Sequence, residues 1–419
     1  MRIDRACIPL LLLLFVASPA PALDITGQSR TYLQSRESTD GTKLMPLYEY
    51  LDIRADSIGT QAVSFNAGGW YRYSLQNEDF NTRKTGDLQY AYLSFKKSTS
   101  NAYLNIGRIV VNQGVASSQL DGASAGTDLK WGFGISGFGG LPVETMFDTR
   151  TGDSVYGGRI SQGVEGLYRI GVSYLLEKND SKDYRKEEGL DLWFRPLDKV
   201  ELTGTAQYNA LTSSCARRNA YLTLGAFGPL TLRTEYTEIS YKDYFTSSTV
   251  SAFLLQAGGP IDPTEKLKTL GEEAALAFGP ITLSADYKKY QYHLSGNADR
   301  FGGTLAYAGA SNIGAGLSAH RMDGKTDALR YDEARIYGYK KFTKIDITAD
   351  VLATKYAAEL NGIKIAYAAS VGAGYALTAK ARLAADIEYS KNPFYDKDVR
   401  GLVKLVYNFD FAPGASGRK

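Results

Sequence analysis

The sequence predicts an all-β fold: a transmembrane antiparallel β-barrel of about 20–22 strands with no separate plug domain. Three observations lead to this prediction. Apolar and polar residues alternate with a period of two through most of the chain, short turn signals separate the alternating stretches, and the chain begins with an export signal. The composition agrees, because 30 tyrosines and 43 glycines among 419 residues suit strands, tight turns and membrane interfaces.

The first residues have the pattern of a secretory signal peptide. Arg2 and Arg5 precede the apolar stretch Cys7–Ala17, and Ala20–Ala22 follows as a small-x-small cleavage site. Eleven apolar residues are too few to cross a bilayer as a helix, so we expect cleavage rather than anchoring. We predict export to the outer membrane of a Gram-negative bacterium and three parts of the chain: a cleaved signal peptide (1–22), a multi-pass outer-membrane β-barrel (23–411) and a short periplasmic tail (412–419).

The alternation of apolar and polar residues is clearest in residues 63–74, 200–209 and 381–389. One face of each strand then suits lipid and the other suits water. No run of eighteen apolar residues follows the signal, which excludes a helical-bundle membrane protein. A soluble all-β protein is the alternative, but a single soluble domain of about 400 residues would be unusually large.

Two kinds of connection separate the predicted strands. Short turn signals, which we assign to the periplasmic side, occur at 57–60, 163–166, 195–198, 227–229, 278–280 and 340–344. Longer polar connections, which we assign to extracellular loops, occur at 76–86, 113–126, 179–186, 242–267 and 391–398. An even strand count places both termini in the periplasm. Outward-facing tyrosines then fall near both membrane interfaces and form two aromatic girdles.

Composition excludes several function classes. The formal net charge is +3 with no block of like charge, so nucleic acid is not an expected partner. Only Cys215 remains after the signal, which leaves no intrachain disulfide and no cysteine-based metal site. His293 and His320 are isolated from any catalytic or metal-binding pattern. We therefore predict no enzymatic activity, and no cofactor or metal bound by this chain.

The polar face of each strand predicts the lining of the lumen. Charges of both signs are interspersed there, which favours weak ion selectivity or a polar surface that binds a protein; alternatively, these side chains only solvate a water-filled wall. The candidate lumen-lining residues are Arg54, Arg72, Arg195, Arg233, Arg335, Arg382, Asp286, Asp350, Asp386 and Glu388, with Asp52, Asp191, Glu235 and Glu333 on the same face. Two segments, 113–126 and 242–267, are long enough to fold inward as a constriction, although each is equally compatible with a surface loop.

Several stretches resemble a known family. They are Tyr48–Asp56, Asn66–Trp70, Asn105–Arg108 and Thr127–Ile135, and they are similar to the porin-like barrels of Geobacter-type metal-reducing bacteria. Members of that group include the barrel of porin–cytochrome complexes, which ensheathes multihaem c-type cytochromes. The resemblance implies periplasmic and extracellular multihaem cytochromes as partners, beside outer-membrane lipid and lipopolysaccharide.

The resemblance leads to two alternative functions. The chain has no Cys-x-x-Cys-His motif, so any haem would belong to partner cytochromes and the barrel would act as an insulating sheath. A barrel of about 22 strands without its own plug would otherwise leave an open hole, and on that ground we favour the sheath. The alternative is a general diffusion porin that passes small hydrophilic solutes or ions.

Overall fold

The computed structural model describes residues 24–37, 41–76, 82–97, 100–143, 150–245 and 264–411. Within these ranges the chain forms one antiparallel sheet of 23 strands. The two-residue strand β2 (Lys43–Leu44) pairs only with the end of β1, so the remaining 22 strands build the wall. The predicted cleaved signal and the predicted periplasmic tail lie outside the described residues.

The wall strands run up and down in sequence order. They are β1 (Asp24–Glu37), β3 (Pro46–Asp56), β4 (Val63–Ser74), β5 (Lys84–Lys96), β6 (Tyr103–Gln113), β7 (Ala116–Asp128), β8 (Phe133–Pro142), β9 (Ser154–Val164), β10 (Tyr168–Asn179), β11 (Lys182–Leu197), β12 (Val200–Asn209), β13 (Ser214–Phe227), β14 (Leu230–Ser240), β15 (Lys266–Phe278), β16 (Ile281–Tyr292), β17 (Gly296–Gly309), β18 (Ile313–Gly324), β19 (Tyr331–Lys341), β20 (Ile345–Leu360), β21 (Ile363–Ala376), β22 (Ala381–Asn392) and β23 (Tyr395–Phe411). The short helices are η1 (Lys130–Gly132), α2 (Tyr241–Phe245) and η2 (Asp327–Leu329). No helix in the described ranges is long and apolar enough to cross a membrane.

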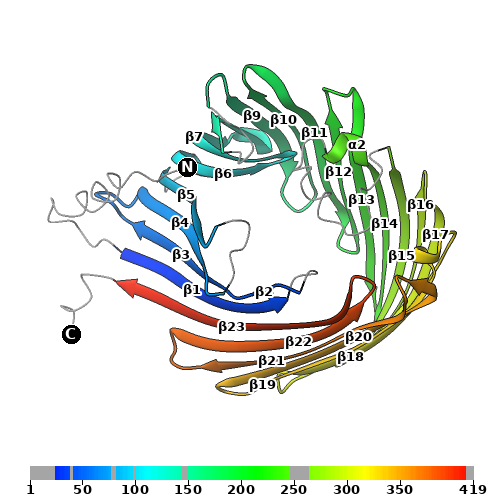
Figure 1. Ribbon diagram of the computed structural model, residues 1–419. Helices are drawn as coiled ribbons and strands as arrows, with labels where there is room; N and C mark the ends of the chain where they lie inside the picture. Colours follow the sequence, from blue (N-terminus) through cyan, green and yellow to red (C-terminus); the bar gives the residue numbers. More distant parts are fainter. Residues whose placement is uncertain are drawn as a thin grey trace.

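The barrel closes between its first and last strands. β1 pairs with β23 from Ile25 opposite Phe411 to Ser35 opposite Gly401, and its other edge pairs with β3 (Figure 1). The closed barrel confirms the predicted fold class, and the described residues form no separate plug domain. If the cross-section were circular, 22 strands about 4.8 Å apart and tilted by about 40° would give a backbone diameter of about 45 Å.

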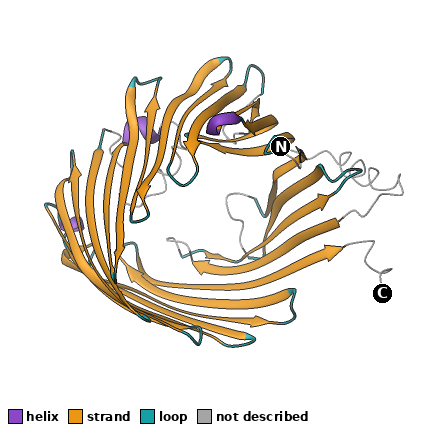
Figure 2. Cartoon of the chain, turned by 180° about the vertical axis from the view of Figure 1, so that it is seen from behind, coloured by secondary structure: helices purple, strands orange, loops and turns teal. Residues whose placement is uncertain are grey.

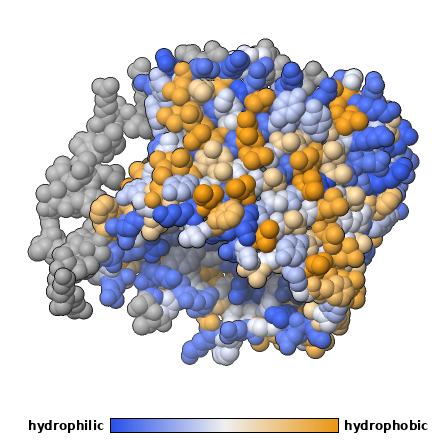
Figure 3. Space-filling view, turned by 90° about the horizontal axis from the view of Figure 1, so that it is seen from below, coloured by the Kyte–Doolittle hydropathy of each residue, from blue (hydrophilic) through white to orange (hydrophobic). Residues whose placement is uncertain are grey.

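The two faces of the wall differ as the alternation predicts. In β16, for example, Ile281, Leu283 and Tyr287 are exposed on the outer face, whereas Asp286 and Lys288 point to the lumen. Apolar side chains spread across the outer wall in the space-filling view (Figure 3). Apolar groups on that face avoid the cost of placing polar groups in lipid, so the inner face is free to be polar.

Both described chain ends, Asp24 and Phe411, lie at one end of the barrel, because Ile25 pairs with Phe411; we call this end the terminal rim. The other end is the loop rim. It carries α2, one of the short helices among the strands (Figure 2). The predicted long loops at 113–126, 179–186 and 391–398 are wrong, because these residues belong mostly to strands. The turn between β10 and β11, for example, consists of Asp180 and Ser181, both with positive φ. Such two-residue turns are rich in polar residues, which made the flanking strand ends resemble loops.

The other two predicted long loops lie only partly within the described residues. Residues 82 and 83 precede β5, which begins within the predicted loop 76–86. The predicted loop 242–267 begins in α2 and ends in β15, and its residues 246–263 lie outside the described ranges.

Candidate functional site: a charged lumen narrowed by a hairpin

Charged side chains on the inner wall pair with one another between strands. Arg335 of β19 donates from Nε to Asp350 Oδ1 of β20 at 3.0 Å. Arg382 of β22 reaches Asp346 Oδ1 of β20 at 2.6 Å, across the glycine backbone of β21. Because each cation lies beside an anion, this part of the wall is polar but nearly neutral.

The other predicted lining residues have different surroundings. Arg54 pairs with Asp56 at 2.8 Å and Arg233 with Glu273 at 3.6 Å, both at exposed positions. Two residues depart from a simple lining role: Arg72 is 4% exposed and donates to the Thr82 carbonyl at 3.0 Å, and Arg195 bonds to Asp198 in a terminal-rim turn. Asp386 is an exposed carboxylate of β22, on the same face as Arg382. Neither Asp386 nor Glu388 forms an ion pair with any other described residue.

A compact charge cluster occupies the inner wall across β16 to β19. Arg300 bridges two carboxylates, at 3.2 Å from Asp286 Oδ2 and 3.4 Å from Glu333 Oε1. His320, 7% exposed in its side chain, places Nε2 2.8 Å from Asp286 Oδ1. The isolated His320 of the sequence is therefore hydrogen-bonded to a carboxylate of this cluster. No group of three potential metal ligands occurs among the described residues.

The barrel wall changes course where β6 leaves β5. The two strands pair only from Ala91 opposite Arg108 to Lys96 opposite Tyr103, so the loop-rim half of β5 has no strand partner on that side. Gly107 permits the bend: its φ is +135°, and a Cβ there would lie 2.3 Å from the Ala91 carbonyl oxygen. Only glycine tolerates this combination of φ and close backbone approach.

Side chains occupy part of the gap between β5 and β6. Arg108 donates to the Leu88 carbonyl at 3.0 Å, and Gln119 donates to the Gln89 carbonyl. Arg108 also forms a two-pronged ion pair with Asp121 of β7, at 2.7 and 3.0 Å. The bonds to Leu88 and Gln89 satisfy β5 backbone carbonyls that would accept hydrogen bonds from a neighbouring strand in an unbroken sheet.

Beyond the bend, the loop-rim half of the β6–β7 hairpin lies against the inner face of β8 to β10. Its apolar side chains are buried together with apolar side chains of the wall: Ile109, Val111, Ala116 and Leu120 of the hairpin, and Phe138, Val155 and Leu175 of the wall. At the tip, the Val115 N–H donates to Ser173 Oγ of β10 at 3.0 Å. The segment 113–126 is thus strand and turn rather than a loop, and its first residues do lie inside the barrel.

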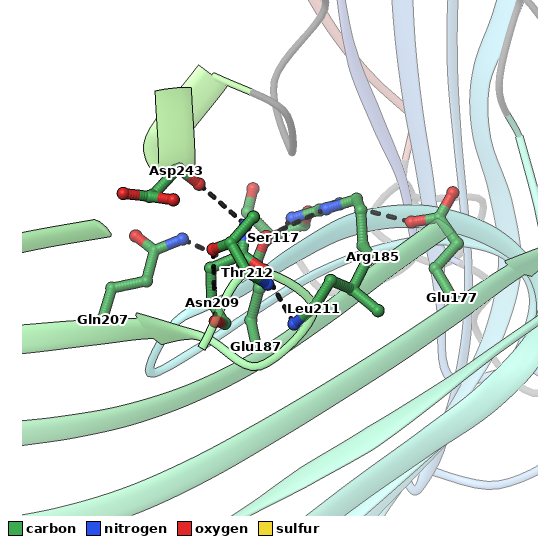
Figure 4. A network of polar contacts seen from close by, with 9 residues as sticks. All are labelled: Ser117, Glu177, Arg185, Glu187, Gln207, Asn209, Leu211, Thr212 and Asp243. Atoms are coloured by element: carbon green, nitrogen blue, oxygen red, sulfur yellow. Dashed lines mark hydrogen bonds and ion pairs between the residues drawn. The ribbon is translucent and has the colours of Figure 1, made fainter. Parts of the chain in front are cut away.

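A buried ion cluster holds the tip of this hairpin (Figure 4). Arg185 of β11 lies between Glu177 and Glu187, at 3.3 and 3.1 Å, and donates to the Ser117 carbonyl of the hairpin at 3.2 Å. Gln207 of β12 donates to Glu187 at 3.1 Å. Both carboxylates are at most 1% exposed. Buried charges of this kind need good mutual geometry, which makes the arrangement sensitive to loss of any member.

The ends of the long β14–β15 connection are also fixed at the loop rim. Asn209 donates to the Asp243 carbonyl of α2 at 2.8 Å (Figure 4). Burial alone would raise the pKa of Asp243, but hydrogen bonds from Ser214 and Ser240 lower it below its usual value. The two ends of the connection meet where the Tyr241 N–H donates to the Glu265 carbonyl at 3.1 Å.

Glu265 joins this connection to the next turn of the rim. Its carboxylate accepts the backbone N–H groups of Lys266, Leu294 and Ser295 at 2.9 to 3.1 Å. Burial raises the pKa of Glu265, but these backbone bonds outweigh burial and lower it. The rim is therefore held by two carboxylates that must stay ionised.

Comparison with known proteins identifies the fold. No protein-family model matches the chain, and no curated protein matches its sequence. A mutant of the ferric enterobactin receptor PfeA from Pseudomonas aeruginosa superimposes with a TM-score of 0.59 and 9% identity, over 94% of this chain and 81% of the receptor. The PapC translocation pore of the P pilus usher gives a TM-score of 0.50 and 9% identity, over 93% and 99%. OccK11 (OpdR) of Pseudomonas aeruginosa superimposes with a TM-score of 0.45 and 11% identity, over 93% of this chain and 96% of OccK11.

The chain has the closed antiparallel fold of an outer-membrane β-barrel. At 9% identity, the receptor and the usher pore share only the fold with it and indicate nothing about what passes through its lumen. The sequence did not single out Arg185, Glu177 and Glu187. A usable signal was the apolar run Ile109–Val111, which breaks the rule that inward positions are polar.

Proposed function

We propose that this chain is a porin-like channel through which small hydrophilic solutes and ions cross the outer membrane, with the β6–β7 hairpin as an inward-folded constriction. The observation that carries the proposal is the inner wall, where charges of both signs pair with one another around a wide, closed barrel. Such a wall suits water and shows no one-sign ring that would select strongly for one ion type.

The pairing of the charges favours water over a bound protein as the lumen content. A surface that binds a protein through charges presents groups whose partners lie on that protein. Here Arg335, Arg382 and Arg300 already have carboxylate partners within this chain. Water completes the solvation of the more exposed Arg335 and Arg382 pairs at little cost.

The folded hairpin gives the channel a narrow zone. Its apolar residues pack on the wall and not on a partner, so the constriction is intrinsic to the chain. A barrel of 22 strands would otherwise be too wide to exclude solutes by size. We place the loop rim at the cell surface, where the outer wall meets lipopolysaccharide, and both chain ends in the periplasm.

The cytochrome sheath stays a prediction, because no described contact and no comparison bears on a haem-containing partner. Liposome swelling tests the channel proposal: the purified barrel in liposomes should admit arabinose faster than maltohexaose. In the comparison variant Leu120→Ala the hairpin is packed more loosely, so the entry rates of arabinose and maltohexaose should differ less. Liposomes that exclude both sugars, with barrel folding confirmed by circular dichroism, would overturn the proposal.

A further inference from the structure

Six aromatic side chains gather on the inner wall of four neighbouring strands. They are Tyr32 of β1, Tyr48 and Tyr50 of β3, Trp70 of β4, and Tyr90 and Tyr92 of β5; we call them the aromatic track. All six are partly exposed. The track therefore presents ring surface to the lumen and does not form a sealed core.

The rings follow one another down the wall. Tyr48 lies 6.3 Å from Tyr50 and 6.4 Å from Trp70, and Tyr32 meets Tyr50 edge-on at 5.5 Å. Tyr90 and Tyr92 form a second ring pair, 6.1 Å apart, and the Tyr90 hydroxyl joins it to the first group through Asp52. The strand register places the paired Tyr32 and Tyr48 nearest the loop rim and Tyr92 farthest from it.

Polar groups with paired charges run beside the rings. Arg30 bonds to Asp52 at 2.6 Å, and Tyr90 donates its hydroxyl to the same carboxylate at 2.6 Å. The Arg30 guanidinium also lies 5.5 Å from the centre of the Tyr50 ring. The wall thus offers flat apolar faces next to a matched donor and acceptor, without a strong excess of one charge.

The track ends at the constriction. Tyr92 packs against the apolar cluster of the folded hairpin. A solute that follows the rings from the loop rim therefore reaches the narrow zone of the lumen while still in contact with the wall.

We infer that the aromatic track is a binding site for neutral saccharides, which it guides lengthwise toward the constriction. A pyranose ring has apolar C–H faces that pack on aromatic rings, and equatorial hydroxyls that hydrogen-bond to groups such as Asp52 and Arg30. As an extended oligosaccharide moves along the wall, each aromatic ring contacts one sugar unit and then the following unit. This inference rests on the proposed channel and names a solute class for it.

The test measures ion current through the purified barrel in planar bilayers as maltohexaose is added. We expect concentration-dependent interruption of the current, and about tenfold weaker apparent affinity in Tyr50→Ala/Trp70→Ala, the equivalent of losing roughly 1.4 kcal/mol of ring contact. Tyr50→Phe/Trp70→Phe keeps the rings and should retain most of the affinity. The matched control is Tyr331→Ala/Tyr356→Ala, which removes an aromatic pair 6.1 Å apart on β19 and β20 and should leave the affinity unchanged.

The outcomes separate the two proposals. A barrel that carries no ion current refutes the channel itself. A barrel that conducts but is not interrupted by maltohexaose overturns the saccharide site while the channel stands. An equal loss of maltohexaose affinity in the β19–β20 control also overturns the saccharide site. If tetramethylammonium interrupts the ion current and maltohexaose does not, the rings bind cations and the saccharide site is again overturned. Quenching of Trp70 fluorescence by the sugar, measured with Trp131→Phe and Trp193→Phe, would support the site independently.

Discussion

Replacing Arg185 by methionine should release the folded hairpin while leaving the barrel closed. The guanidinium holds Glu177, Glu187 and the Ser117 carbonyl at 3.1 to 3.3 Å, and its own side chain is 10% exposed. Methionine is apolar and cannot replace any of these bonds. Two buried carboxylates would then remain without their cation, a change that typically costs about 3–5 kcal/mol.

The barrel itself should survive this loss. Its strands are held by backbone hydrogen bonds. The loop-rim half of the hairpin, before β7 begins to pair with β8 at Leu120, is held to the rest of the barrel mainly by side-chain contacts and one apolar cluster. The cost should therefore appear as opening of the hairpin. Taking the lower figure, about 3 kcal/mol, the open population rises by roughly 150-fold; partial access of water to the lumen reduces this, and we expect at least about tenfold.

Cysteine labelling measures the opening directly. Ala116 is 1% exposed within the cluster, so Ala116→Cys should react with a maleimide only when the hairpin leaves the wall. The exposed thiol of Cys215 is first removed by Cys215→Ser. Arg335→Met serves as the control, since the Arg335–Asp350 pair is exposed and contributes about 0–1 kcal/mol. Equal labelling rates in Arg185→Met and the parent would refute the reasoning.

Three further predictions concern the hairpin and the rim. Leu120→Ala should weaken hairpin packing by about 2–5 kcal/mol and raise single-channel conductance, because Leu120 is fully buried in the cluster; unchanged conductance would mean that the hairpin does not narrow the path. Gly107→Ala should give a mixture of conductance levels, since its Cβ would meet the Ala91 carbonyl oxygen at 2.3 Å; a single parental level would contradict the assigned bend. The lowered pKa of Glu265 contributes stability that is fully present above about pH 4.5, the usual pKa, and is lost as the pH falls through the lowered value. The protection factors of the Leu294 and Ser295 amides, corrected for the intrinsic exchange rate at each pH, should therefore fall on acidification below pH 4.5, and Glu265→Gln should show the low protection at neutral pH. Protection factors that do not change with pH would count against the role of the carboxylate.

Alternation along the chain was enough to predict the wall and its inner face. Arg335 and Asp350 were placed on one face because a strand repeats every two residues, and the register makes them diagonal neighbours: Arg335 lies opposite Leu352, and Asp350 lies opposite Tyr337. The ion pairs themselves depend on which residues of neighbouring strands face each other. Arg382 meets Asp346, two strands away, and a single sequence contains no information on that register.

The folded hairpin was beyond prediction for a different reason. The apolar run Ile109–Val111 interrupts the alternation of β6, but a run of three apolar residues does not tell whether the strand stays in the wall or leaves it. The bend depends on Gly107, and isolated glycines are common in this chain. Likewise, Asp180 and Ser181 were assigned to a long loop because polar turn residues flanked by charged strand ends look alike in sequence.

Single-channel recording of the purified barrel in planar bilayers, with a visible spectrum of the same preparation, tests the central claim most directly. We predict steady ion conductance without any partner, with weak selectivity between cations and anions, and higher conductance in Arg185→Met/Leu120→Ala. A barrel that passes no current and co-purifies with stoichiometric c-type haem would contradict the channel and support a cytochrome sheath.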